Sequence, residues 1–166
     1  MTDQGAPVEG VRVFLRVSEL ISQHARTDAN GAFSFDMLGR GVYTLYFTRS
    51  GYLHKTLVVS LAEGDSPVEA DVVLKPGAVL QGRVVDTLTG HPVRVFGGRI
   101  TTEDRLRSWR LHVAGDGRFV TDTVPDGEYV LTIHSKNYEP ALIQGVAVKD
   151  HLAPPELTVT LKPLHR

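Results

Sequence analysis

Hydrophobic and polar residues alternate along most of this chain, in short runs that end at Gly, Pro, Asn or Asp. From Val11 to Val17 the apolar residues fall on every second position, with Arg12 and Arg16 between them. Alternation with a period of two predicts half-buried strands, and no stretch carries the apolar stripe of an amphipathic helix. The same pattern predicts strands over residues 33–36, 43–48, 57–61, 68–75, 78–86, 109–113, 119–121, 129–133, 146–148 and 157–161.

Short half-buried strands separated by turn residues are typical of an antiparallel β-sandwich. We expect Tyr43 and Tyr129 to be buried in central strands, because each falls on the apolar side of its run. The pairs Asn30-Gly31 and Asp116-Gly117 predict type I′ hairpin turns, since both residues of each pair tolerate positive φ.

The chain also carries one pattern twice, at an offset of 85 to 87 residues. Gly5-Ala6-Pro7-Val8 recurs as Gly90-His91-Pro92-Val93, and each copy closes on Leu-Lys-Pro, at Leu74 and at Leu161. The repetition predicts two small domains, residues 1–76 and 77–166.

Composition and charge exclude several classes of partner. The chain has 18 Lys and Arg against 19 Asp and Glu, which gives no basic excess for nucleic-acid binding. No apolar run approaches the roughly 20 residues of a membrane helix, and residues 1–4 lack the pattern of a secretion signal. With no cysteine, disulfides and thiolate metal sites are excluded in this segment.

The second copy carries an ordered set of motifs: Gly82–Asp86, Thr89–Val93, the turn Asp116–Phe119, Gly127–Leu131 and the pair Asn137-Tyr138. In this set it resembles a carboxypeptidase regulatory-like domain. The first copy resembles the same family through Gly5–Val8, Thr27–Phe33, Gly41–Leu45 and Gly51-Tyr52.

This resemblance implies a seven-stranded, prealbumin-like sandwich in each copy, related also to starch-binding-like sandwiches. The shared motifs mark turns and core positions, so they transfer no catalytic residue. Bacterial members of the family occur mostly in secreted, outer-surface or periplasmic proteins, which implies an extracellular, cell-surface or periplasmic location.

The first copy departs from the second in its leading strand. Residues 78–86 form the first predicted strand of the second copy, but only four residues precede Gly5 in the first. We therefore expect the first domain to lack this strand and to expose an open sheet edge, to which another protein or a neighbouring domain of a longer array could pair. An upstream segment that supplies the strand is the favoured interpretation, and a capping variant with an open edge is the alternative.

The connection Leu74-Lys75-Pro76-Gly77 is too short for a flexible linker and suits a spacer.

No metal, cofactor or catalytic residue is predicted. The seven histidines are dispersed without zinc-ligand spacing, and Thr27–Gly31 begins like a calcium loop but lacks the later ligands. The chain carries none of the common catalytic motifs. It also ends differently from the transthyretin-related hydroxyisourate hydrolase, and Arg83 stands where a self-made Lys–Asn crosslink would need lysine.

Seven residues are candidate contacts to a ligand or partner. Trp109 shares a strand face with Leu111 and Val113, which predicts the core, but an exposed Trp could stack on a sugar ring. Phe14 and Tyr46 fall on outward faces, where they could form an apolar patch. The other candidates are Arg105, Arg107, Arg110 and Tyr138.

Two functions remain open from the sequence. The first is a non-catalytic structural or interaction module, a spacer or docking segment of a larger exported protein. The second is a carbohydrate-binding module that would use Trp109, Tyr46 or Tyr138 to bind polysaccharide.

Overall fold

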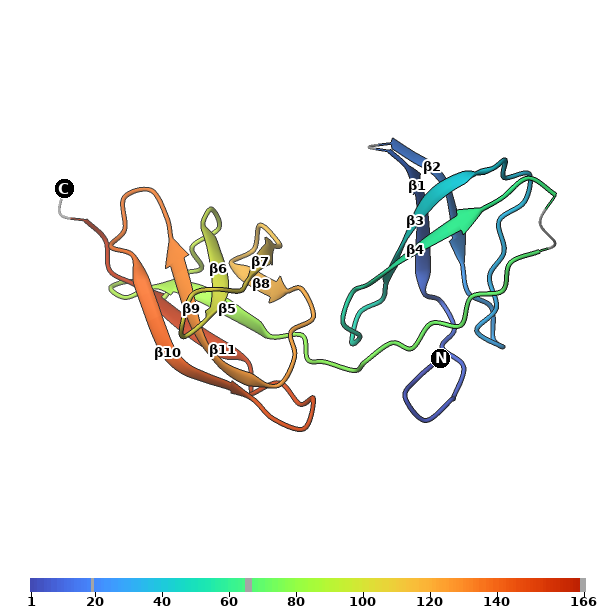
Figure 1. Cartoon of the computed structure of the whole chain (residues 1–166). Coiled ribbons are helices and arrows are strands. Elements are labelled where there is room, and N and C mark those ends of the chain that lie inside the picture. Colours follow the sequence, from blue (N-terminus) through green and yellow to red (C-terminus); the bar gives the residue numbers. More distant parts are fainter. Residues whose placement is uncertain (19, 65–66, 165–166) are drawn as a thin grey trace. The chain divides into compact units, whose positions relative to one another are not determined.

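The computed structural model describes residues 1–18, 20–64 and 67–164, and every regular element in these ranges is a β-strand. The chain divides into two compact units, Met1–Pro76 (unit 1) and Gly77–Arg166 (unit 2). Both units are drawn in Figure 1, which shows strands and no helix. The all-β class predicted from the alternation is therefore confirmed.

Unit 1 contains a single antiparallel sheet of four strands in the order β2-β1-β3-β4. Alternate residues of β3, Tyr43, Leu45 and Phe47, are buried, as are Val13 and Leu15 of β1. Each strand thus presents one apolar side to the core, as its alternation predicts. The strands are β1 (Arg12–Val17), β2 (Leu20–Arg26), β3 (Gly41–Thr48) and β4 (Lys55–Leu61).

Unit 2 contains seven strands in the order β10-β9-β6-β7-β8-β5-β11. The first half of β7 pairs with β6 and its second half with β8, so that the sheet folds over into two layers. Side chains from both layers, among them Leu131 and Val84, form one buried cluster. The strands are β5 (Gln81–Asp86), β6 (Gly97–Thr102), β7 (Ser108–Val113), β8 (Arg118–Thr121), β9 (Gly127–His134), β10 (Ala141–Val148) and β11 (Leu157–Leu161).

Unit 2 departs from a purely antiparallel sandwich in one place. Strands β5 and β11 pair in parallel, with Gly82 opposite Leu157 and Val84 opposite Val159. These are the first and last strands of the unit, so no tight hairpin joins them and nothing forces them to be antiparallel.

The two units share the order of four strands. The order β2-β1-β3-β4 of unit 1 matches β7-β6-β9-β10 of unit 2, and all of these pairs are antiparallel. By the sequence correspondence, residues 32–36 stand for β8 and residues 68–75 for β11.

The strands predicted over residues 33–36 and 68–75 are not paired strands in the structure, and Figure 1 draws both segments as coil. Unit 2 supplies part of the physical reason, since β11 pairs with β5 and β8 pairs with β5 and β7. Among the described residues of unit 1, no strand corresponds to β5, so residues 68–75 lack the one neighbour of β11 and residues 33–36 lack one of the two neighbours of β8.

A buried tyrosine with the same local hydrogen bond lies in the central strand of each unit. The hydroxyl of Tyr43 donates to the carbonyl of Gly39 at 2.8 Å, and that of Tyr129 to the carbonyl of Pro125 at 2.5 Å. Burial raises the pKa of Tyr129, which keeps its hydroxyl a donor. The prediction that both tyrosines are buried is confirmed.

The predicted type I′ turns were wrong. Gly31 and Gly117 have φ of 74° and 92°, but neither Asn30 nor Asp116 has a positive φ. Instead, the Asp28 carboxylate accepts hydrogen bonds from the backbone N–H groups of residues 30 and 32, and Asp116 accepts one from residue 118. An aspartate that bonds the following backbone closes the turn without a second left-handed residue.

Candidate interaction site

Two extended segments of unit 1 have unpaired backbone groups. The N–H and C=O groups of residues 33–35 and 68–71, and the C=O group of Pro67, make no hydrogen bond to another described residue. We call these two segments the open edges. Unpaired backbone at a sheet edge offers hydrogen bonds to an added strand, which makes the open edges candidates for binding an extended chain.

A cavity of about 370 Å³ lies between the segments that carry the open edges. Ala32 and Phe33 line it from one side, and Ala70, Val72 and Leu74 line it from the other. The lining also includes the core side chains of Val8, Val11 and Phe47. The lining also contains the polar residues Thr27, Asn30 and Asp71. The apolar part of this cavity can receive apolar side chains from a strand that bonds to both segments.

The backbone of Met1 pairs with residues 72–74 in the way that the end of β5 pairs with β11 in unit 2. The Met1 amino group donates to the carbonyl of Val72, and the N–H of Leu74 donates to the carbonyl of Met1, both at 2.8 Å. This is the bonding of one residue in a parallel pair, with Met1 opposite Val73. In unit 2 the equivalent pair is Val85 of β5 opposite Thr160 of β11. Met1 therefore takes the place of Val85.

Phe14 and Tyr46 lie next to each other in unit 1. They are directly opposite on β1 and β3, on the side of the sheet turned away from the core, and both are half-buried. The guanidinium carbon of Arg16 lies 5.3 Å from the Tyr46 ring centroid. The structure thus brings these two predicted contact residues together and covers one of them with Arg16.

Trp109 is a half-buried residue at the margin of the unit 2 core. Its ring meets the ring of Tyr129 edge-on, with centroids 5.5 Å apart and an interplanar angle of 86°. The guanidinium carbon of Arg107 lies 5.3 Å from the Trp109 ring centroid. Packing against Tyr129 and Arg107 gives Trp109 a structural role in unit 2.

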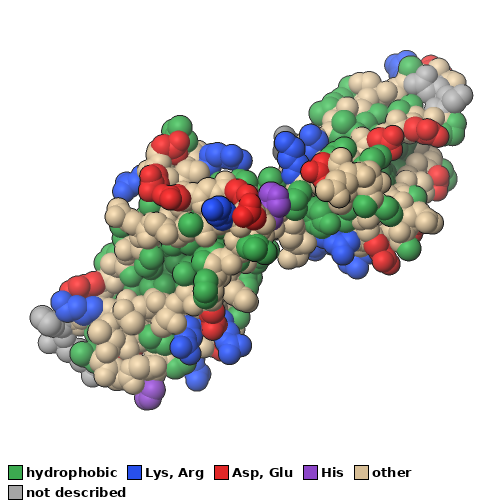
Figure 2. Space-filling model, turned by 90° about the horizontal axis from the view of Figure 1, so that it is seen from below, with side chains coloured by type: hydrophobic (Ala, Val, Ile, Leu, Met, Phe, Trp, Pro, Cys, Tyr) green, Lys and Arg blue, Asp and Glu red, His purple; other side chains and the backbone are tan. Residues whose placement is uncertain are grey.

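The other predicted arginines are exposed. Arg105 has a φ of 59° in the turn between β6 and β7, and Arg110 lies on β7 opposite Arg99 of β6. On the face shown in Figure 2, basic and acidic side chains are interspersed rather than gathered by sign.

Tyr138 is held by an aspartate in unit 2. Its hydroxyl donates to the Asp86 carboxylate at 3.0 Å, and its backbone bridges to Pro163. The backbone N–H of Thr89, with smaller effects from Leu88 and Tyr138, lowers the pKa of Asp86 against the opposing effect of desolvation. The hydrogen bond to Asp86 raises the pKa of Tyr138.

These hydrogen bonds predict that ionised Asp86 stabilises unit 2 at neutral pH and that this stabilisation is lost in acid. Because the folded pKa of Asp86 lies below its usual 3.8, its contribution is complete above that value and is lost as the pH falls through the lowered pKa. We expect Asp86→Asn to lower the melting temperature of unit 2 at neutral pH, and the difference from the unsubstituted chain to shrink in acid. Melts followed by Trp109 fluorescence between neutral pH and pH of about 2 test this. A difference that stays constant with pH would contradict it.

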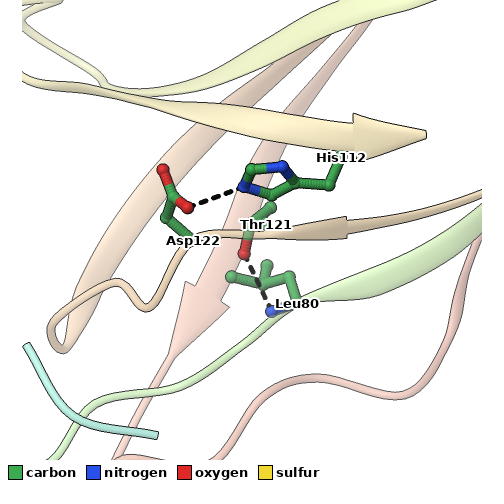
Figure 3. A network of polar contacts seen from close by, with 4 residues as sticks. All are labelled: Leu80, His112, Thr121 and Asp122. Atoms are coloured by element: carbon green, nitrogen blue, oxygen red, sulfur yellow. Dashed lines mark hydrogen bonds and ion pairs between the residues drawn. The ribbon is translucent and has the colours of Figure 1, made fainter. Parts of the chain in front are cut away.

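Polar contacts also connect β7 and β8 of unit 2 with the segments next to them. His112 and Asp122 are in contact at 2.7 Å, and the N–H of Leu80 donates to the hydroxyl of Thr121 at 3.0 Å (Figure 3). These contacts fasten β7 to the residues after β8 and β8 to the segment before β5. The described residues contain no group of three or more His, Asp or Glu placed to hold a metal ion.

The part of the chain that the structure describes contains no helix able to cross a membrane.

Sequence reasoning predicted an open edge in unit 1 but named none of the residues that form it. The signal was present, because residues 33–36 and 68–75 alternate like strands and the first copy has no predicted strand equivalent to residues 78–86. The candidate residues named from the sequence lie elsewhere.

Residues 1–75 match the sequence model of the carboxypeptidase regulatory-like domain family. The predicted resemblance is therefore confirmed for nearly the whole of unit 1. No curated protein matches the chain.

Several solved structures are similar to the chain. A streptococcal ancillary pilin is 18% identical, with a TM-score of 0.45 over 99% of this chain and 60% of its own. GBS52, the minor pilin of Streptococcus agalactiae, is 16% identical, with a TM-score of 0.38 over 97% of this chain and 86% of its own. The shaft pilin SpaA of Lactobacillus rhamnosus GG is 12% identical, with a TM-score of 0.45 over 100% of this chain and 92% of its own. The chain thus spans less than two thirds of the streptococcal ancillary pilin.

Proposed function

We propose that this chain is a non-catalytic structural and interaction module, and that the open edges of unit 1 form its docking surface. The observation that supports this most is the difference in pairing between the units. Strand β5 fills the position between β8 and β11 in unit 2, whereas residues 33–35, 70 and 71 of unit 1, which correspond to residues of β8 and β11, are unpaired. Unpaired backbone groups at a sheet edge can pair with an added strand, so such edges favour a partner.

The connection between the units supports an additional spacer role. Pro76 bridges to Tyr52 within unit 1, and Ala78 bridges to Val124 within unit 2. Only Gly77 separates these two paired residues, which leaves no length for a flexible linker.

We extend the family to unit 2, as a second carboxypeptidase regulatory-like domain, because its sheet repeats the strand order of unit 1. Membership of this family implies an exported parent protein that is located at the cell surface, outside the cell or in the periplasm. Other domains of that parent, or other proteins beside it, are the partners this function requires.

Carbohydrate binding has weaker support than docking. A sugar platform needs an aromatic face open to the ligand. Arg107 lies over Trp109, Arg16 lies over Tyr46, and the hydroxyl of Tyr138 is bonded to Asp86. Polysaccharide therefore remains the alternative ligand, with no contact in the structure that favours it.

Hydrogen exchange on the full chain tests the docking function. We expect the amides of residues 33–35 and of Ala70 to exchange at least about a hundredfold faster than those of residues 119–121 and of Leu157, because only the latter lie in strands paired with β5. The two sets of amides occupy corresponding places, so residues 119–121 and Leu157 are matched controls within one molecule. Strong protection of both open edges at every protein concentration would show that they are already paired, and would overturn the proposal.

A further inference from the structure

We infer that unit 1 accepts an extended β-strand from outside residues 1–166, which inserts between the two open edges and completes the unit. The inference rests on the proposed docking function, and it adds the class of the partner, the direction of the strand and its side-chain pattern.

The direction and register of the donated strand follow from Met1. Met1 lies opposite Val73 in a parallel pair and takes the place of Val85, so a strand in the same ladder ends immediately before it. This strand runs parallel to residues 67–74 and antiparallel to residues 32–36, as β5 does between β11 and β8. Its residues take the places of Ala78–Val84.

The backbone of unit 1 already points toward this position. Successive N–H groups of an extended chain point to opposite sides. The N–H of Leu74 points to Met1, so those of Val72 and Ala70 point the same way, into the gap where the donated strand lies. The N–H of Glu69 points to the other side.

Unit 2 shows which side chains the strand needs. Leu80 and Val84 are fully buried at 0% exposure, so their places demand apolar residues. Between them, a Cβ atom on Gly82 would lie 2.6 Å from the Phe119 ring and 2.5 Å from the carbonyl oxygen of Leu157, so only glycine fits. Phe33 and Ala70 hold the corresponding places in unit 1. The donated strand therefore has the pattern apolar, any residue, glycine, any residue, apolar.

A segment from outside residues 1–166 is a better donor than β5 of a second copy. The chain's own strand of the required pattern is β5, which pairs with β8 and β11 and buries Leu80 and Val84. Donating it to another copy would expose those side chains and break both ladders of unit 2. A partner with an unpaired segment loses nothing comparable.

The test uses a capped synthetic peptide with the sequence of Ala78–Val84, titrated into the full chain. We expect saturable binding by calorimetry, with slower hydrogen exchange at residues 33–35 and at Ala70 and no change in β8 or β11. Copying the same seven residues directly in front of Met1 places each in register. This fused strand fills the site within the chain and should abolish binding of the added peptide.

Two matched pairs of variants test the geometry. A peptide with valine at the place of Gly82 should bind at least about tenfold more weakly, because its side chain meets Phe33. In the protein, Ala70→Pro removes an N–H that faces the gap and should also weaken binding at least about tenfold, whereas Glu69→Pro removes one that faces away and should not. Neither N–H is bonded to another of the described residues, so both variants keep the hydrogen bonds among these residues.

Three results would overturn the inference. The first is no peptide binding while exchange shows the open edges unprotected, which leaves the docking function standing with a partner of another class. The second is equal binding of the glycine and valine peptides. The third is a dimer of the chain, in which the open edges become protected as the protein concentration rises.

Discussion

Replacing Tyr129 by alanine is expected to lower the stability of unit 2 by about 3 kcal/mol or more, which corresponds to a fall in melting temperature of at least about 12 °C. The Tyr129 ring is 1% exposed at the centre of the unit, where it meets the Trp109 ring edge-on. Alanine would leave a cavity and would remove the hydrogen bond to Pro125. A thermal melt of the full chain followed by Trp109 fluorescence measures the effect.

Tyr129→Phe is the matched control, because it keeps the ring and removes only the hydroxyl. It should cost about 1 kcal/mol, the usual net contribution of one hydrogen bond. If Tyr129→Ala lowered the stability no more than Tyr129→Phe, the ring would not be the packing centre of unit 2 and its assignment to the core would be wrong.

Gly82→Val is expected to destabilise unit 2 by about 3 kcal/mol or more. A Cβ at this position would lie 2.5 Å from the carbonyl oxygen of Leu157, so β5 and β11 would have to separate. The Phe119 ring would lie 2.6 Å from the same Cβ, so the valine side chain could not shift toward the core instead. Chemical denaturation of the full chain, followed by Trp109 fluorescence, measures the loss.

Gly39→Ala is the control for replacing a glycine. No atom lies within 4 Å of a Cβ at Gly39, and its φ is not positive, so its stability should change by no more than about 0.5 kcal/mol. A Gly82→Val variant as stable as Gly39→Ala would show that β5 and β11 do not approach as closely as described.

The strands that the sequence predicted well are those with a clear apolar alternation. Residues 43–48 and 129–133 lie within β3 and β9, because Tyr, Leu, Phe and Ile on alternate positions face the cores. Strands β2 and β6 were not predicted. Strand β6 was missed because the pair Gly97-Gly98 breaks the alternation. A Cβ at Gly98 would clash with the carbonyl oxygen of Thr132, so the neighbouring strand requires glycine there. Glycine here serves close strand packing, which local alternation does not reveal.

The candidate site shows a second limit of sequence reasoning. Residues 33–36 and 68–75 have the composition of strands, but a strand also needs a neighbour, and pairing is a property of the whole sheet. The sequence pointed to aromatic and arginine residues as ligand contacts. In the structure, however, the Trp109 ring packs against Tyr129 and Arg107. The proposed site consists of backbone N–H and C=O groups, which nearly every residue type has, so no particular residue in the sequence indicates the site.

The parallel pairing of β5 with β11 has a mechanical consequence. Because the two strands run in the same direction, the chain enters the ladder at one end, near Gln81, and leaves it at the other, near Leu161. A force that pulls the ends of unit 2 apart therefore slides the strands past each other and loads all the hydrogen bonds of the ladder together, instead of opening them one at a time. A unit joined in this way resists tension along the chain, which suits a spacer in a protein that is pulled from both sides.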